Sequence, residues 1–104
     1  MNEVQKKVQL FCKKNNLSSS VEHRALDILS ELGELSKEIL KASNYGISRY
    51  AANEKVKLEL GDVLFSLITV ANSLDVNLNA ALEVVLKKYE KRIKEGSTPD
   101  SSYE

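Results

Sequence analysis

The sequence predicts an all-α fold, and three features lead to this prediction. Leu, Lys, Glu and Ala, which favour helices, are abundant, whereas the 104 residues include only four glycines and one proline. Apolar residues recur at spacings of three and four along four segments. Short polar stretches rich in Ser, Asn or Gly separate these segments. We therefore expect a protomer of four helices, at about residues 3–15, 21–42, 54–74 and 78–94.

The first two helices are each predicted from one apolar stripe. In 3–15, Val4, Val8 and Phe11 recur at i, i+4 and i+7, and lysines take the other side. The serines at 18–20 offer an N-cap to 21–42, because a hydroxyl accepts a hydrogen bond from an unpaired N–H at a helix start. The expected packing face of 21–42 consists of Ala25, Leu26, Leu29, Leu32, Ile39 and Leu40. A neighbouring polar strip consists of His23, Asp27, Glu31, Glu34 and Glu38.

The third helix, 54–74, is predicted to be apolar almost all round. Asn53 is the expected N-cap, and ten of the seventeen residues from Leu58 to Leu74 are Leu, Val, Ile, Phe or Ala. Such a helix should be largely buried, yet three other helices in a short chain can hardly enclose it. We therefore expect the protomers to assemble into a helical-bundle homodimer or tetramer.

The fourth helix, 78–94, is expected to begin at an Asn77 cap and to end in a basic turn before Gly96. Its apolar positions recur at three and four residues. Residues 96–104, which include Pro99, are expected to form a disordered tail. By length, residues 1–95 should be one domain.

Composition argues against several classes of partner. Fifteen basic residues balance fifteen acidic ones, so the charge of a nucleic-acid or membrane-surface binder is missing. The longest uncharged stretch, 63–74, is too short to span a bilayer. The one cysteine, Cys12, cannot form an internal disulfide, and the chain opens without a secretory signal. We expect a soluble, cytoplasmic protein.

Two pairs of acids stand out against this background. Glu31 and Glu34 lie three apart on the second helix, and Glu59 and Asp62 repeat this spacing on the third helix after a gap of 24 residues. Residues three apart are neighbours on a helix, and a short connection makes the two helices antiparallel neighbours. The two pairs could therefore face each other and hold Mg²⁺, for which Mn²⁺ could substitute, because oxygen ligands select these ions over zinc. Mg²⁺ held by few carboxylates usually completes its shell with phosphates, which indicates a nucleoside polyphosphate ligand.

Each feature also has a plainer interpretation. Acidic rows on helices are usually solvated surface residues. Asp62, however, lies in mid-helix before an apolar run, so a solvated surface position does not explain it well. Lys88 and Arg92, four apart on the last helix, could contact phosphates or could only complement the helix C-terminus. Glu38 is either a residue that orients water or a solvated residue that pairs with Lys37 or Lys41. The absence of a Glu-x-x-His pair argues against a di-iron bundle.

The segments SELGEL, LELGDVLFSLITVAN and ALEVVLKKYEKR, in this order over about Val21 to Ile93, resemble the MazG-like nucleotide pyrophosphohydrolases of the all-α NTP pyrophosphatase superfamily. The resemblance implies a helical dimer or tetramer that cleaves a nucleoside triphosphate between the α and β phosphates in a Mg²⁺-dependent reaction. It implies that Glu31, Glu34, Glu59 and Asp62 are metal ligands and catalytic residues. Lys88 and Arg92 match the basic pair that contacts phosphate. The sequence departs from the pattern at Ser30, where many members carry a further glutamate.

Two classes of function follow from these observations. The first is a house-cleaning or regulatory hydrolase that converts an NTP or dNTP to the monophosphate and pyrophosphate. A variant of this function is a pyrophosphohydrolase of a modified nucleotide such as phosphoribosyl-ATP. The second class is a non-catalytic helical dimer that binds metal or nucleotide. An assay of pyrophosphate release from a panel of nucleotides separates the two.

Overall fold

The computed structural model describes residues 1–51 and 53–96, and every regular element in these ranges is a helix. The helices are α1 (Glu3–Lys14), α2 (Val21–Ala42), α3 (Glu54–Ser73) and α4 (Leu78–Lys94). The four predicted helices are confirmed, and their ends differ from the expectation by no more than one residue. Gly96 follows α4 with a φ of 82°, a left-handed conformation that favours glycine. The rest of the expected tail, residues 97–104, lies outside the described residues.

Side-chain caps explain why each helix begins where it does. At all four N-termini a polar side chain accepts a hydrogen bond from the backbone N–H three residues later, and so satisfies one of the unpaired donors of the first turn. The sequence analysis predicted the caps of α2, α3 and α4, but it did not predict the cap of α1. The capping residues are Asn2, Ser20, Asn53 and Asn77.

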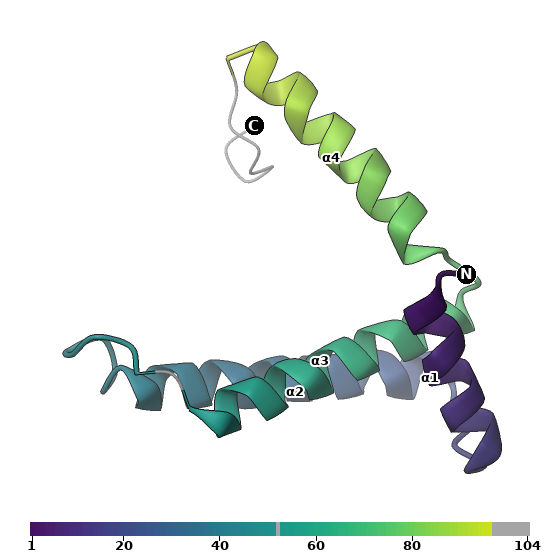
Figure 1. The fold of residues 1–104 in the computed structure, drawn as a ribbon, viewed down its shortest axis with the longest axis horizontal. Coiled ribbons are helices and arrows are strands. Elements are labelled where there is room, and N and C mark those ends of the chain that lie inside the picture. Colours follow the sequence, from purple (N-terminus) through teal and green to yellow (C-terminus); the bar gives the residue numbers. More distant parts are fainter. Residues whose placement is uncertain (52, 97–104) are drawn as a thin grey trace.

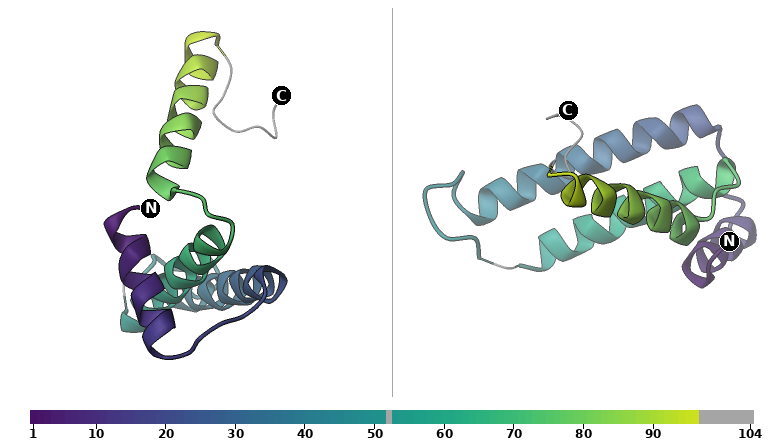
Figure 2. Two further views of the ribbon diagram at one scale, coloured as in Figure 1. Left: turned by 90° about the vertical axis from the view of Figure 1, so that its right-hand side faces the viewer. Right: turned by 90° about the horizontal axis from the view of Figure 1, so that it is seen from above.

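The longest helices, α2 and α3, lie side by side as an antiparallel hairpin, and α1 packs across the end of α3 (Figures 1 and 2). α4 leaves this group at 100° to α3 and extends away from the hairpin. The Cα radius of gyration is 16.7 Å, compared with about 13 Å for a compact domain of 100 residues. The protomer is therefore open, with α4 as a projecting arm.

Gln5 fastens α1 to the corner between α3 and α4. Its side chain is fully buried, donates a hydrogen bond to the Val76 carbonyl at 2.7 Å and accepts one from the Leu78 N–H at 2.8 Å. Val76 and Leu78 flank Asn77, the cap of α4. One amide side chain thus satisfies backbone groups at the start of the arm, which would otherwise be unpaired at a buried position.

The predicted packing face of α2 is wrong for the single chain. Leu26 and Leu29 are 62% and 68% exposed. The partly buried side of α2 is instead the stripe Val21, Arg24, Ile28, Glu31, Leu35, Glu38 and Ala42, and this stripe faces α3. The pairing with α3 therefore buries a stripe that includes an arginine and two glutamates, and it leaves the leucine-rich face uncovered.

α3 is also less buried than its composition predicts. Among the described residues, the buried apolar side chains are Val56, Ile68 and Ala71, all on α3, whereas Leu58, Leu60 and Leu64 are at least half exposed. The reason is that α1 and α2 cover only part of its circumference and α4 turns away. No single helix in the described ranges is long and apolar enough to cross a membrane; only α3 and α4 together, across their bend of 100°, reach that length and apolarity.

Candidate metal centre

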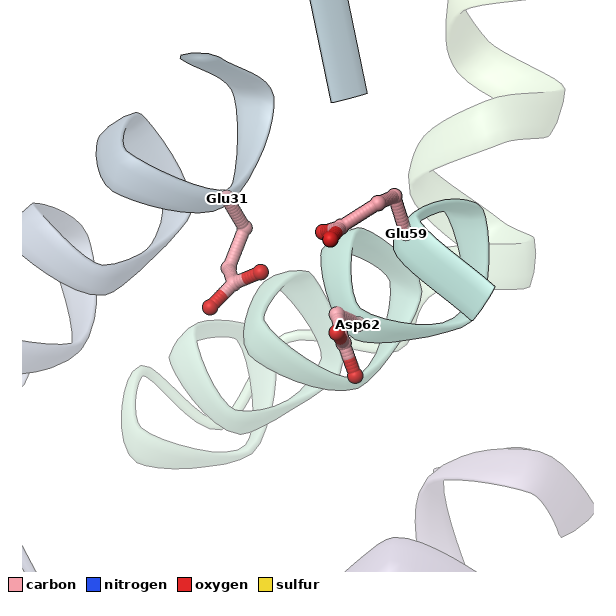
Figure 3. A group of neighbouring side chains, drawn as sticks. All are labelled: Glu31, Glu59 and Asp62. Atoms are coloured by element: carbon pink, nitrogen blue, oxygen red, sulfur yellow. The ribbon is translucent and has the colours of Figure 1, made fainter. Parts of the chain in front are cut away.

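Three of the four predicted ligands meet between α2 and α3. Glu31 projects from α2 toward the side of α3 that carries Glu59 and Asp62 (Figure 3). One carboxylate oxygen from each residue can be chosen so that all three oxygens lie within 4.8 Å of one another. The sequence-based expectation that acids of the two helices face each other is thus realised for this triad, which we call the acidic cluster.

The cluster follows from helical periodicity and from the antiparallel pairing. Glu59 and Asp62 share one side of α3 because three residues make nearly one turn. Glu31 belongs to the α2 stripe that faces α3. Glu31 and Glu59 are half-buried and Asp62 is exposed, so the cluster opens to solvent on the Asp62 side. A ligand can reach it from there.

Glu59 lies at the electrostatic centre of the site. Its Oε2 atom is buried and has no hydrogen-bond partner among the described residues. Burial raises the pKa of Glu59 above 4.5, and the negative charges of Asp62, Glu31, Glu34 and Glu38 raise it further. A buried carboxylate oxygen without a donor is costly unless a cation compensates it. This atom is therefore the strongest sign that the cluster is built around a positive charge.

The donor set fits a hard divalent cation. All donors are carboxylate oxygens, which suit Mg²⁺ and Mn²⁺. Neighbouring oxygens around an octahedral Mg²⁺ are about 2.9 Å apart, so the three side chains, whose oxygens lie within 4.8 Å of one another, would have to rotate inward to hold the ion. Three ligands leave room for water and phosphate oxygens in the rest of the shell.

Glu34 and Glu38 lie next to the triad without joining it. Glu34 is exposed, yet its charge acts on the pKa of Glu59. Glu38 forms an ion pair with Lys41 at 3.9 Å, which confirms the expected pairing, but its side chain is only 14% exposed, so the expectation of a solvated residue is wrong. The charge of Glu38 also raises the pKa of Glu59. The sequence reasoning missed this burial. The spacing could have predicted it, because Glu38 follows Glu31 by seven residues and therefore lies on the same side of α2.

The basic pair predicted to contact phosphate does not face the acidic cluster within one protomer. Lys88 and Arg92 lie on α4, which extends away from the hairpin (Figure 1). Both cations lie over the ring of Tyr89, with Lys88 Nζ 5.4 Å and Arg92 Cζ 5.8 Å from its centroid. The proposed contact of Lys88 and Arg92 with phosphate stays a prediction. It requires that α4 of another protomer lie near the acidic cluster, or that α4 of the same protomer take a different direction.

Comparison with known proteins connects this geometry with a family. Residues 19–97, from before α2 to beyond α4, match the model of the MazG nucleotide pyrophosphohydrolase domain. The crystal structure of a Bacillus-conserved MazG protein, described as a nucleotide pyrophosphohydrolase, superposes with a TM-score of 0.70 at 31% identity, over 84% of this chain and 85% of that chain.

A curated relative of unassigned function adds sequence similarity. The uncharacterized protein YpjD of Bacillus subtilis (strain 168) is 41% identical over an alignment of 71 residues, and the alignment covers 65% of this chain and 62% of YpjD. The matched segment thus spans less than two thirds of that relative.

Proposed function

Because the chain belongs to the MazG nucleotide pyrophosphohydrolase family, we propose that it hydrolyses a nucleoside or deoxynucleoside triphosphate to the monophosphate and pyrophosphate. The observation that carries this proposal is the buried Oε2 of Glu59 beside Glu31 and Asp62, which has no hydrogen-bond partner within residues 1–51 and 53–96. We propose Mg²⁺ as the cofactor, replaceable by Mn²⁺, because the donors are all carboxylates.

The residues divide into those that hold the cation and one that moves a proton. Glu31, Glu59 and Asp62 would hold Mg²⁺, which supplies Lewis-acid polarisation of the phosphates and of the attacking water. Glu34, predicted from sequence as a fourth ligand, lies outside the triad but close enough to affect Glu59. This position supports a role as the base that accepts the proton of the attacking water.

We further propose that the active form is a homodimer or a larger homo-oligomer. The leucine-rich face of α2, the uncovered sides of α3 and the projecting α4 together support this proposal, because monomers rarely expose so much contiguous apolar surface. A partner's α4 docked against the hairpin could bring the partner's basic pair to the phosphates bound at the acidic cluster. Lys88 and Arg92 would then stabilise the departing pyrophosphate.

A nucleotide panel tests the function. Purified protein is incubated with each NTP, each dNTP and phosphoribosyl-ATP, with Mg²⁺ or with EDTA, and pyrophosphate is measured. We expect Mg²⁺-dependent pyrophosphate release in the wild type and none in Asp62→Asn, which keeps the size of the side chain. Nucleotide binding without release of pyrophosphate would indicate the non-catalytic binding module instead.

A further inference from the structure

α4 meets the other helices at its first turn. Within residues 1–51 and 53–96, the helix pairs with extensive contacts are α2 with α3 and α1 with α3. α4 starts at the corner beside α1 and α3 and then extends away from the hairpin (Figures 1 and 2). The groups that hold its first turn therefore decide where Lys88 and Arg92, further along α4, are presented.

Gln5 of α1 supplies hydrogen bonds that hold this first turn. The turn before α4 is bonded to α3 as far as the Val76 N–H, which donates to the Ala71 carbonyl at 2.9 Å. Beyond this group the bonds go to α1, because Gln5 Nε2 donates to the Val76 carbonyl and Gln5 Oε1 accepts from the Leu78 N–H. These two bonds lie on either side of Asn77, the cap of α4. Together they resist rotation of the chain at the point where α4 begins.

The bonds of Gln5 call for a side-chain amide of this length. Gln5 is fully buried, and its Nε2 donates to Asn72 as well as to Val76 while its oxygen accepts from Leu78. Two donors and an acceptor on one planar group are offered only by Gln and Asn, and Asn is one methylene shorter. Methionine has a similar length and volume, so Gln5→Met removes these bonds without leaving a large cavity.

The space beneath the first turn of α4 is not filled by side chains. A cavity of about 220 Å³ lies between α1, α3 and the start of α4, and its lining includes Val4, Leu64 and Leu78. A water molecule needs only about 10 to 15 Å³, so this space is many times larger than one water. The first turn therefore has room to tilt once the bonds of Gln5 are removed.

The length of α4 converts a small tilt into a large displacement of the basic pair. Lys88 and Arg92 follow Leu78 by ten and fourteen residues, which correspond to about 15 and 21 Å along a helix. A tilt of about 10° at the corner would move these positions by about 3 to 4 Å. A misplacement of about 1 Å in an active site can lower the rate by about a hundredfold. Contact of the basic pair with phosphate therefore requires a corner that does not tilt.

We propose that Gln5 is a positioning residue of the hydrolase: it holds the start of α4 and so places Lys88 and Arg92 for contact with the phosphates. This inference rests on the proposed function. It assigns a role to α1, which precedes residues 19–97, the part of the chain that matches the family model. Where α4 reaches another protomer, α1 of one protomer acts on the active site of its partner.

The first test is a double-mutant cycle, run where circular dichroism shows each variant to be folded. Gln5→Met should lower kcat/KM for the best nucleotide at least about tenfold, because it misplaces the basic pair. In a protein that already carries Lys88→Ala and Arg92→Ala, measured by single turnover, it should cost less than about twofold, because the groups that it displaces are absent. A purely structural role would give equal factors in both backgrounds. Gln9→Met, at an exposed position one turn later, is the matched control and should keep wild-type kinetics.

The second test measures the hold on α4 without turnover. The first N–H groups of a helix have no partner within the helix, but the Leu78 N–H donates to the buried Gln5. In the wild type, hydrogen exchange at the Leu78 amide should be at least about a hundredfold slower than at the next residue, the exposed Asn79. Gln5→Met should abolish this protection and leave the amide of the buried Ile68 protected. Loss of protection at both amides would show general unfolding and would overturn the proposal.

The outcomes separate the two proposals. Wild-type kinetics in Gln5→Met, equal factors in the two backgrounds, or fast exchange of wild-type Leu78 overturns the positioning role and leaves the hydrolase function standing. If the wild type releases no pyrophosphate from any nucleotide, the hydrolase function fails. Binding of inorganic tripolyphosphate with Mg²⁺ then replaces the kinetics: a dissociation constant raised about tenfold by Gln5→Met supports the positioning role, and an unchanged or unmeasurable one overturns it.

Discussion

Gln5 and Asn72, 67 positions apart in the chain, hydrogen-bond to each other in both directions. Gln5 Nε2 donates to Asn72 Oδ1 at 3.0 Å, and Asn72 Nδ2 donates to the Gln5 carbonyl at 3.1 Å. Together with the bonds from Gln5 to Val76 and Leu78, this pair connects α1, the end of α3 and the start of α4. A buried polar network therefore holds the start of the α4 arm against α1 and α3.

Gln5→Ala should destabilise the protein by about 2 to 5 kcal/mol, because it leaves several buried polar groups at the corner without partners, each at a cost of about 1 to 3 kcal/mol. Urea unfolding at fixed protein concentration measures this loss. Gln9→Ala, one turn later and exposed, is the matched control and should change stability by less than about 0.5 kcal/mol. Equal stability of the two variants would show that the network does not fix the corner.

Asp62→Asn should raise the melting temperature in EDTA while abolishing pyrophosphate release. Without metal, the charges of Asp62, Glu31 and Glu59 repel one another, and the substitution removes one of them. In the wild type, Mg²⁺ should raise stability by about 2.7 kcal/mol at a hundred times its dissociation constant, and Asp62→Asn should respond weakly. Asp27→Asn, at an exposed position of α2, should behave as the wild type. An active Asp62→Asn variant would contradict the metal site.

The stability of the metal-free protein should fall as pH rises above 4.5, owing to Glu59. Because the folded-state pKa of Glu59 is raised, the folded protein binds more protons than the unfolded chain between 4.5 and the raised value. This contribution is present below pH 4.5 and is lost as pH rises through the folded-state pKa. Melting curves in EDTA from pH 4 to 8 should show a shallower decline for Glu59→Gln than for the exposed control Glu83→Gln. Parallel profiles would exclude Glu59 as the cause.

Lys88→Ala and Arg92→Ala should each lower kcat/KM by about tenfold to a hundredfold without unfolding the protein, since a charge-assisted contact to phosphate contributes about 1.5 to 3 kcal/mol. Lys87→Ala, also exposed on α4, is the control. If the basic pair acts on the partner's site, co-expression of inactive Asp62→Asn with the Lys88→Ala, Arg92→Ala double variant should restore about a quarter of wild-type activity in a dimer. No restoration would indicate that each protomer uses its own pair.

Light scattering should detect a dimer or tetramer at micromolar concentration. Leu29→Asp, on the leucine-rich face of α2, should shift the protein toward a less stable monomer, because the charge would be buried in the interface. Glu22→Asp, at an exposed position of the same helix, should leave the assembly unchanged. A folded wild-type monomer at these concentrations would refute the proposed oligomer.

Local chemistry in the sequence determined the helices and the composition of the acidic cluster. Ser20, Asn53 and Asn77 mark helix starts because capping needs only a polar side chain and the next three residues. Likewise, the spacing of Glu59 and Asp62 places them on one side of α3 whatever the helix packs against. Such features depend on residues within one or two turns, so they can be deduced without a structure.

The tertiary structure decided which of the available faces meet. α2 has a leucine-rich face and a stripe containing Arg24, Glu31 and Glu38, and in the chain it is the stripe that contacts α3. The helical spacing shows which residues of α2 share a face, but it does not show which face packs against another helix. That choice depends on contacts between segments far apart in the sequence. For the same reason, the link between Gln5 and Asn72 and the direction of α4 could be known only from the folded chain.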